Sequence, residues 1–149
     1  KGMAEAKTEQ VKKGLPDWLK ERFNKGNQFN KDNRPRYDYN EVRVTKDGNE
    51  FRVDSYNRNS EIVSRKFTQL AEIKEGTAIS YLNELDKKYS PGTEIINGTF
   101  NPKELGGLTL EGQMILEIPV QKCDVPIKVI EKAKELHIVI RDVEGKVYK

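Results

Sequence analysis

The stretch FRVDSYNRNSEIVSRKFTQL (51–70) reads as two β-strands joined by a polar turn. Apolar and polar residues alternate on both sides of the turn NRNS, which is the pattern of strands with one buried face. The strands also carry Asp54, Ser64 and Lys66, where a simple barrel or sandwich would place apolar side chains. This combination predicts a polar site built on the two strands.

A hairpin joins this stretch to the residues before it. Two alternating runs in EVRVTKDGNEFRVDSY (41–56) flank Asp47-Gly48, a dipeptide typical of two-residue hairpin turns. Counting back from that turn sets Glu41 opposite Asp54, with Cβ atoms ~5 Å apart. Two carboxylates at that spacing repel by roughly 3 kcal/mol at an effective dielectric of about 20. A divalent cation bound between them would make use of this pair.

The third strand adds a cation and an amide. Ser64 and Lys66 share a face because side chains alternate along a strand. An odd number of turn residues after Tyr56 would place that face beside Asp54, and Gln69 would reach the same cleft where the strand ends. Metal-binding carboxylates, a lysine and a polar amide are the groups that metal-dependent phosphodiester hydrolysis needs.

The remaining chain alternates helices and strands. Hydrophobic spacing predicts helices over residues 15–23, 77–89 and 126–136, and further strands over 93–97, 113–121 and 137–143. The α-β-β-β-α-β order, followed by β-α-β, predicts a mixed α/β domain with a central sheet flanked by helices. We expect Trp18 and Phe23 to lie in its core.

Residues 24–40 are predicted to form a turn-rich loop that contacts nucleic acid. Basic residues alternate there with aromatic residues, a composition that suits stacking and backbone contacts. The basic residues proposed for this contact are Lys31, Arg34 and Arg36. Arg65, on the opposite strand face from Lys66, is predicted to be either a surface residue or a residue that contacts phosphate.

The composition narrows the kinds of site that the chain can hold. The 149 residues suit one domain, with 34% charged residues and a net charge of +3. One cysteine and one histidine exclude a disulfide framework, a cysteine-based zinc site and a multi-histidine site. We expect Cys123 to be a buried thiol and His137 to be structural.

No run of the sequence approaches the ~18 apolar residues of a membrane span, and no signal peptide is recognisable. The chain opens KGMAEAKTEQ, without a methionine at position 1, and reads as a segment of something longer. We expect residues 1–14 to form a linker or frayed segment and residues 15–149 to form a single domain.

The order of elements, with Asp54 on the second strand and Lys66 on the third, resembles the PD-(D/E)xK, or restriction-endonuclease-like, nucleases. Several segments resemble the C-terminal toxin domains of bacterial polymorphic toxins of that fold, which end contact-dependent inhibition, Rhs-like and LXG-type secreted proteins. The resemblance covers roughly residues 20–149. It is carried by GNQFNKDNRPRYDYNEV (26–42), FRVDSY (51–56), EIVSRKFTQL (61–70), YLNEL (81–85), KYSPGT (88–93), LEIPVQ (116–121) and IRDVEGKVY (140–148).

The resemblance assigns roles to residues of this chain. It implies that Asp54 binds Mg²⁺ or Mn²⁺, that Lys66 is the motif lysine, that Glu41 is an extra acidic ligand and that Gln69 is a trailing amide. The motif expects an acid two residues before the lysine, where this chain has Ser64. Three explanations are open: Ser64 is a weak ligand, Glu61 reaches the site through a β-bulge, or Glu41 has taken over the role.

The function implied by the resemblance is a metal-dependent endonuclease toxin. It would be secreted as part of a larger protein and cleave DNA in the cytoplasm of a target cell, with RNA, particularly tRNA, as the alternative substrate. A cognate immunity protein would be its partner. The alternative of another class is a non-catalytic nucleic-acid-binding module, in which Glu41 and Asp54 are surface acids paired with Arg43 or Arg52 and Lys66 is a solvated lysine.

Overall fold

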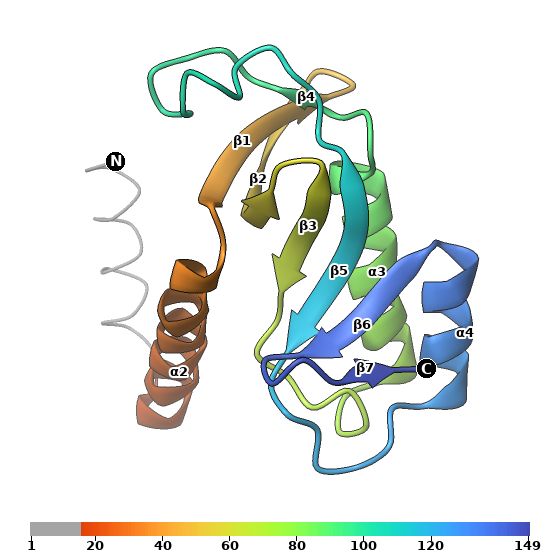
Figure 1. The fold of residues 1–149 in the computed structure, drawn as a ribbon. Coiled ribbons are helices and arrows are strands. Elements are labelled where there is room, and N and C mark those ends of the chain that lie inside the picture. The colour runs from red at the N-terminus through yellow and green to blue at the C-terminus, as the bar shows by residue number, and fades with distance from the viewer. Residues whose placement is uncertain (1–15) are drawn as a thin grey trace.

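Residues 16–149, which the computed structural model describes, fold around one seven-stranded mixed sheet with helices on both faces (Figure 1). The strand order is β4-β1-β2-β3-β5-β6-β7. The helices are α2 (Asp17–Asn33), α3 (Glu75–Tyr89) and α4 (Ile127–Glu135), with a short 3-10 helix η1 (Arg34–Arg36). The strands are β1 (Tyr39–Lys46), β2 (Asn49–Asn57), β3 (Ser60–Arg65), β4 (Glu94–Ile95), β5 (Gly112–Ile118), β6 (Ile138–Asp142) and β7 (Val147–Tyr148). The predicted α+β class and αβββαβ core are confirmed, and the predicted linker lies outside the described residues.

The β1–β2 hairpin forms as the sequence predicts. Lys46 pairs with Asn49 across the turn. Asp47 has a φ of 52° and Gly48 a φ of 80°, the two positive values that a type I′ turn requires. This turn sets the register of the whole hairpin.

Strands β3, β5 and β6 form the parallel part of the sheet. β5 pairs in parallel with β3 and with β6, and the chain returns through α3 and α4, which cover one face of the sheet (Figure 1). Apolar residues at helical spacing, including Leu82 and Leu85 of α3 and Val129 of α4, pack against Ile62 and Leu116 of the strands. We call this buried cluster the main core. Among residues 16–149, no helix has the length and apolar character needed to cross a bilayer.

The first helix corrects two predictions. α2 continues to Asn33, so residues 24–33 are helical rather than a turn-rich loop. Its end is anchored by tertiary contacts, because Asn33 is buried there and Asn30 accepts a hydrogen bond from Arg65. Trp18 and Phe23 are 61% and 44% exposed, not in the core, because no residue of α2 joins the main core.

The position of Cys123 also differs from the prediction. It is exposed on the loop between β5 and α4, where the chain crosses the surface of the molecule. The prediction of a buried thiol is therefore wrong.

Candidate functional site

The candidate site lies where β2 and β3 separate. Their antiparallel pairing ends at Ser55 opposite Val63, and one further step in the same register would set Ser64 opposite Asp54. At that step the Asp54 carboxylate, through Oδ2, instead accepts a hydrogen bond of 2.7 Å from the backbone N–H of Arg65. The side chain of Asp54 therefore takes the place of a backbone contact and holds the two strands at their point of divergence.

The β1–β2 ladder is interrupted at the same level. The pairs Asn40–Ser55 and Val42–Val53 flank Glu41 and Asp54, so Glu41 stands opposite Asp54 in register, as predicted. Glu41 itself has a φ of 52°, a left-handed conformation that is uncommon outside glycine.

At this interruption, each strand switches the side of the sheet on which its alternate side chains lie. In β1, Tyr39 and Val42 are three residues apart, and both side chains contact the main core. In β2, Val53 and Tyr56 have the same spacing, and both also contact the main core. Strict alternation would place the members of each pair on opposite faces. Both strands therefore change face at Glu41 and Asp54, which simple alternation in the sequence does not predict.

Burial decides the protonation behaviour of Asp54. Desolvation raises its pKa above the ordinary value of 3.8, while the Arg65 amide and the charges of Arg65 and Lys66 act in the opposite direction. The charge of Glu41 also raises this pKa, but its effect is smaller than those of burial, Arg65 and Lys66. Within residues 16–149, the second oxygen of the Asp54 carboxylate makes no hydrogen bond. The group is thus a partly desolvated acid with one oxygen available to a ligand.

Lys66 lies immediately after β3, which ends at Arg65 rather than at residue 70. Its backbone N–H donates to the carbonyl of Glu117, 3.0 Å away, so the chain stays attached to β5 at this point. Its ammonium group lies 3.2 Å from a carboxylate oxygen of Glu84 and 5.1 Å from the ring centroid of Tyr81. Lys66 therefore stands between β3 and α3.

Glu84 is the site residue that the sequence analysis missed. It lies on α3, half-buried, and pairs with Lys66 and, at 3.5 Å, with Lys88. Tyr81, Glu84 and Lys88 follow helical spacing and form one polar stripe of α3, which is the signal that could have drawn attention to it. Nothing in the sequence indicates that this stripe meets the end of β3.

Tyr89 connects the two acids electrostatically. Burial, followed by the charges of Asp54 and Glu84, raises its pKa to about 12. Tyr89 is therefore near enough to both carboxylates, one on β2 and one on α3, to be influenced by their charges. Tyr89 keeps its proton at neutral pH, so it can donate a hydrogen bond but cannot serve as a base.

Glu41 is turned toward cations instead of toward Asp54. Its carboxylate accepts a hydrogen bond from Arg34 at 3.1 Å and lies 4.0 Å from Arg52, and its side chain is 45% exposed. The predicted pairing with Arg52 as a strand-surface acid is present, alongside the register position opposite Asp54. A role as the second metal ligand would require this side chain to leave Arg34.

The structure places Ser64 and Glu61 on opposite faces of β3. Ser64 is buried on the strand face that also carries Ile62. Glu61 points to the other face, where it pairs with Arg141 at 2.6 Å, and β3 pairs regularly with β5 along its length. The proposed β-bulge is therefore absent from β3, and Glu61 does not reach Asp54.

Gln69 is held by the backbone. Its amide donates to the carbonyl of Val120 at 2.9 Å and accepts from the N–H of Lys122 at 2.8 Å. Both ends of the amide fasten the chain after β3 to the segment after β5. With both ends of the amide engaged, Gln69 is not free to act as the trailing amide that the resemblance implies.

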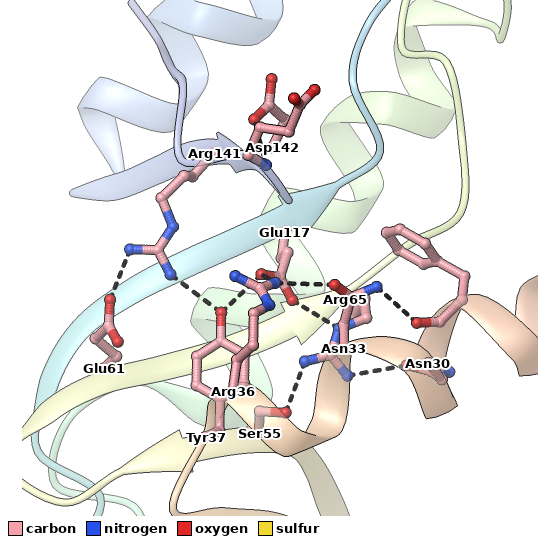
Figure 2. A network of polar contacts seen from close by, with 12 residues as sticks. Asn30, Asn33, Arg36, Tyr37, Ser55, Glu61, Arg65, Glu117, Arg141 and Asp142 are labelled. Atoms are coloured by element: carbon pink, nitrogen blue, oxygen red, sulfur yellow. Dashed lines mark hydrogen bonds and ion pairs between the residues drawn. The ribbon is translucent and has the colours of Figure 1, made fainter.

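Arg65 is buried, so the prediction of a surface residue is wrong. Figure 2 shows its guanidinium in a polar network with Asn30, Ser55 and Glu117. It lies 2.7 Å from Glu117 and also donates to Ser55 and Asn30, and the side chains of Arg65 and Glu117 are 0% exposed. The sequence reasoning missed Glu117, although an acid within the apolar strand 113–118 was a visible anomaly.

The same network fixes the end of α2 and η1. Glu117 accepts hydrogen bonds from Arg36 and from the hydroxyl of Tyr37, and the Tyr37 hydroxyl in turn accepts one from Arg141 (Figure 2). Arg36 is thus tied to a buried acid and Arg34 to Glu41, while Lys31 is exposed on α2. Of the three basic residues predicted to contact nucleic acid, Lys31 is the one with no ion pair in the described part of the chain.

Comparison of the chain with protein-family models, with curated proteins and with solved structures found no match. Within residues 16–149, no group of three or more histidine, cysteine, aspartate or glutamate side chains converges as a metal site. The donors available near Lys66 are the carboxylates of Asp54 and Glu84. One or two carboxylates, completed by waters and phosphate oxygens, are the ligands that Mg²⁺ commonly takes in proteins, so the residues present fit such an ion.

Proposed function

We propose that this chain is a metal-dependent nuclease of the restriction-endonuclease-like fold, acting as the toxin domain of a larger secreted protein. The observation that carries the proposal is the position of Lys66, which pairs with Glu84 of α3 at 3.2 Å and whose charge acts to lower the pKa of Asp54, where β2 and β3 separate. Two carboxylates and a lysine, supplied by two adjacent strands and a helix, are groups that metal-dependent phosphodiester hydrolysis uses.

Glu84 supplies the acid that the sequence motif lacks at Ser64. The strand position two residues before Lys66 is occupied by a buried serine, while Glu84 reaches the same lysine from α3. We therefore assign Asp54 and Glu84, rather than Asp54 and Glu41, as the carboxylates that hold Mg²⁺ or Mn²⁺. Glu41 would contribute through its charge alone.

The residues of the chain have distinct roles in this proposal. A bound divalent cation would neutralise charge on the phosphate and acidify a water molecule. Lys66 places a positive charge beside the scissile phosphate, and in the absence of substrate Glu84 holds it in position. Asp54 is held by the Arg65 amide with one oxygen open. Tyr89, protonated at neutral pH, can donate a hydrogen bond at the site but cannot remove a proton.

The substrate we propose is DNA in the cytoplasm of a target cell, and RNA is the alternative. A domain that cuts nucleic acid would also harm the cell that makes it, so a cognate immunity protein is the partner we propose.

A cleavage assay tests this proposal. The purified chain is incubated with plasmid DNA and, separately, with total RNA, in Mg²⁺, in Mn²⁺ and in EDTA. We expect fragments with one substrate in the presence of metal and none in EDTA. Binding of nucleic acid without cleavage under every condition would support the non-catalytic module instead.

Glu84→Gln separates the two possible carboxylate pairs. This substitution keeps the shape of the side chain and removes its charge, and we expect it to abolish cleavage. Glu41→Gln is the matched variant and should retain most of the activity. The opposite result would return the ligand role to Glu41.

A further inference from the structure

A groove lies between α2 and the residues that follow β3. It measures about 340 Å³ and includes Lys66 in its wall, so it adjoins the candidate site. Ligand pockets for small molecules span ~300–1,000 Å³, so the groove has the size of a site for one small group rather than for a double helix.

Aromatic rings form much of this groove, and two of them are open to solvent. Phe67 is 48% exposed and Phe23 is 44% exposed, and both line it. Phe29 supports Phe67 from within, with ring centroids 5.3 Å apart. Rings held in this way offer flat apolar surface that the fold itself does not cover.

The charged side chains that line the groove are all basic: Arg22, Arg65 and Lys66. Arg65 is paired with Glu117 and Lys66 with Glu84. Arg22 is exposed and has no ion pair within residues 16–149. An occupant with a flat ring and a negative charge would match both the aromatic surface and the cations.

The middle of the α2 wall is open. Gly26 lines the groove, and a Cβ placed on it would meet no atom within 4 Å. A side chain added at this position therefore starts in open space beside the groove, and a glycine within a helix is the least favourable residue after proline. Gly76, in the first turn of α3, has the same open surroundings but does not line the groove.

We propose that this groove binds an unpaired nucleobase of the substrate, with the attached phosphate directed toward Lys66. The inference rests on the proposed function and specifies its substrate as a single strand or a locally unpaired nucleotide. Bases within a duplex present their edges to the grooves and keep their faces stacked, so they cannot enter a narrow aromatic site unless they are extruded. Stacking on aromatic side chains combined with cationic contacts to the backbone is the usual recognition of single strands.

Binding to labelled oligonucleotides in EDTA tests the groove apart from cleavage. Fluorescence anisotropy would compare a ten-nucleotide single-stranded DNA, the RNA of the same sequence and the corresponding DNA duplex. We expect both single strands, or one of them, to bind more tightly than the duplex. Gly26→Leu should abolish this preference, and Phe67→Ala should weaken single-strand binding roughly 5- to 150-fold, the range for loss of one stacked base.

Gly76→Leu is the matched control and should bind like the wild type, which separates filling of the groove from the general effect of replacing a helical glycine. Equal affinity for duplex and single strand, or unchanged single-strand binding by Gly26→Leu, would overturn the inference. If the protein cleaves duplex plasmid in the presence of metal but Gly26→Leu and Phe67→Ala leave single-strand binding unchanged, the proposed nuclease function stands and the nucleobase site is rejected. If the protein binds single strands selectively through the groove but cleaves no substrate, the nucleobase site stands and the proposed nuclease function is rejected.

Discussion

Arg65 and Lys66 are neighbours at the end of β3, but their side chains meet opposite environments. Arg65 enters a closed network in which Glu117 is fully buried and accepts hydrogen bonds from Arg65, Arg36 and Tyr37. Lys66 faces α3 and pairs with a half-buried acid, close to Asp54, which keeps one oxygen without a hydrogen bond in the described structure.

The difference indicates which of the two polar clusters is structural and which keeps a group available to a ligand. A buried network that satisfies all its members makes the local structure unique and rigid. A partly desolvated acid with a raised pKa lowers stability at neutral pH and is typical of functional sites. Arg65 also joins the two regions, because its backbone N–H holds Asp54 while its side chain holds Glu117.

The largest expected effect on the free energy of unfolding comes from the buried network around Arg65 and Glu117. Glu117→Ala leaves the guanidinium of Arg65 buried without its carboxylate, and breaking a buried ion pair typically costs about 3–5 kcal/mol. We expect urea unfolding to show a loss of free energy of unfolding in that range. Glu84→Ala, which breaks the half-buried pair with Lys66, should cost no more than about 1 kcal/mol. Similar losses for the two variants would contradict the distinction between the two clusters.

The next largest effect is on catalysis at the candidate site. Asp54→Ala and Lys66→Ala should each reduce cleavage at least ~100-fold, the scale for loss of one electrostatic group at an active site. The circular dichroism spectrum should be unchanged, because neither side chain belongs to the main core. A folded variant of either residue with near-normal activity would place the site elsewhere.

A smaller effect concerns the desolvation of Asp54. Asp54→Asn keeps an oxygen for the Arg65 amide and removes the charge. We expect the variant to melt a few degrees higher than the wild type at pH 7 without metal, because ~1 kcal/mol shifts the midpoint by roughly 2–8 °C at this general size. Equal melting temperatures would show that the charge carries no cost.

The pH dependence follows from the direction of the pKa shift. Burial, opposed by the Arg65 amide and nearby cations, raises the pKa of Asp54 in the folded state above the ordinary 3.8, so folding favours its protonated form. The wild type therefore gains stability relative to the variant as the pH falls through the raised value, and the difference disappears by about pH 3.8. Millimolar Mg²⁺ or Mn²⁺ should stabilise the wild type and do much less for Asp54→Asn.

The smallest effect should come from Glu61, the acid nearest in sequence to the motif position. Burial raises its pKa, but hydrogen bonds from Arg141 and Asn57 outweigh burial, and the net pKa is lowered. Glu61→Ala should cost about 1 kcal/mol of stability and leave cleavage unchanged. Because the folded pKa is below the unfolded one, this contribution is present above the ordinary Glu value of 4.5 and is lost as the pH falls through the lowered value. A folded but inactive Glu61→Ala would move the metal ligand to Glu61.

The sequence by itself determined the features that depend on near neighbours in the chain. Asp47-Gly48 determined the hairpin, since both positions adopt the positive φ of the turn, and the turn sets Glu41 opposite Asp54 in register. The periodicity of α3 and α4 and the alternation in β2 and β3 predicted the helices, the sheet and two of the three residues that meet at the site, Asp54 and Lys66.

Only the tertiary structure decided the contacts between distant parts of the chain. The pairing of Lys66 with Glu84 joins residues 18 positions apart, and that of Arg65 with Glu117 joins residues 52 positions apart. The burial of Arg65, the change of face at Glu41 and the length of α2 follow from such contacts. Local propensity carries no record of them, because the free energy that stabilises them comes from charges and apolar surfaces that meet only when the sheet and its helices assemble.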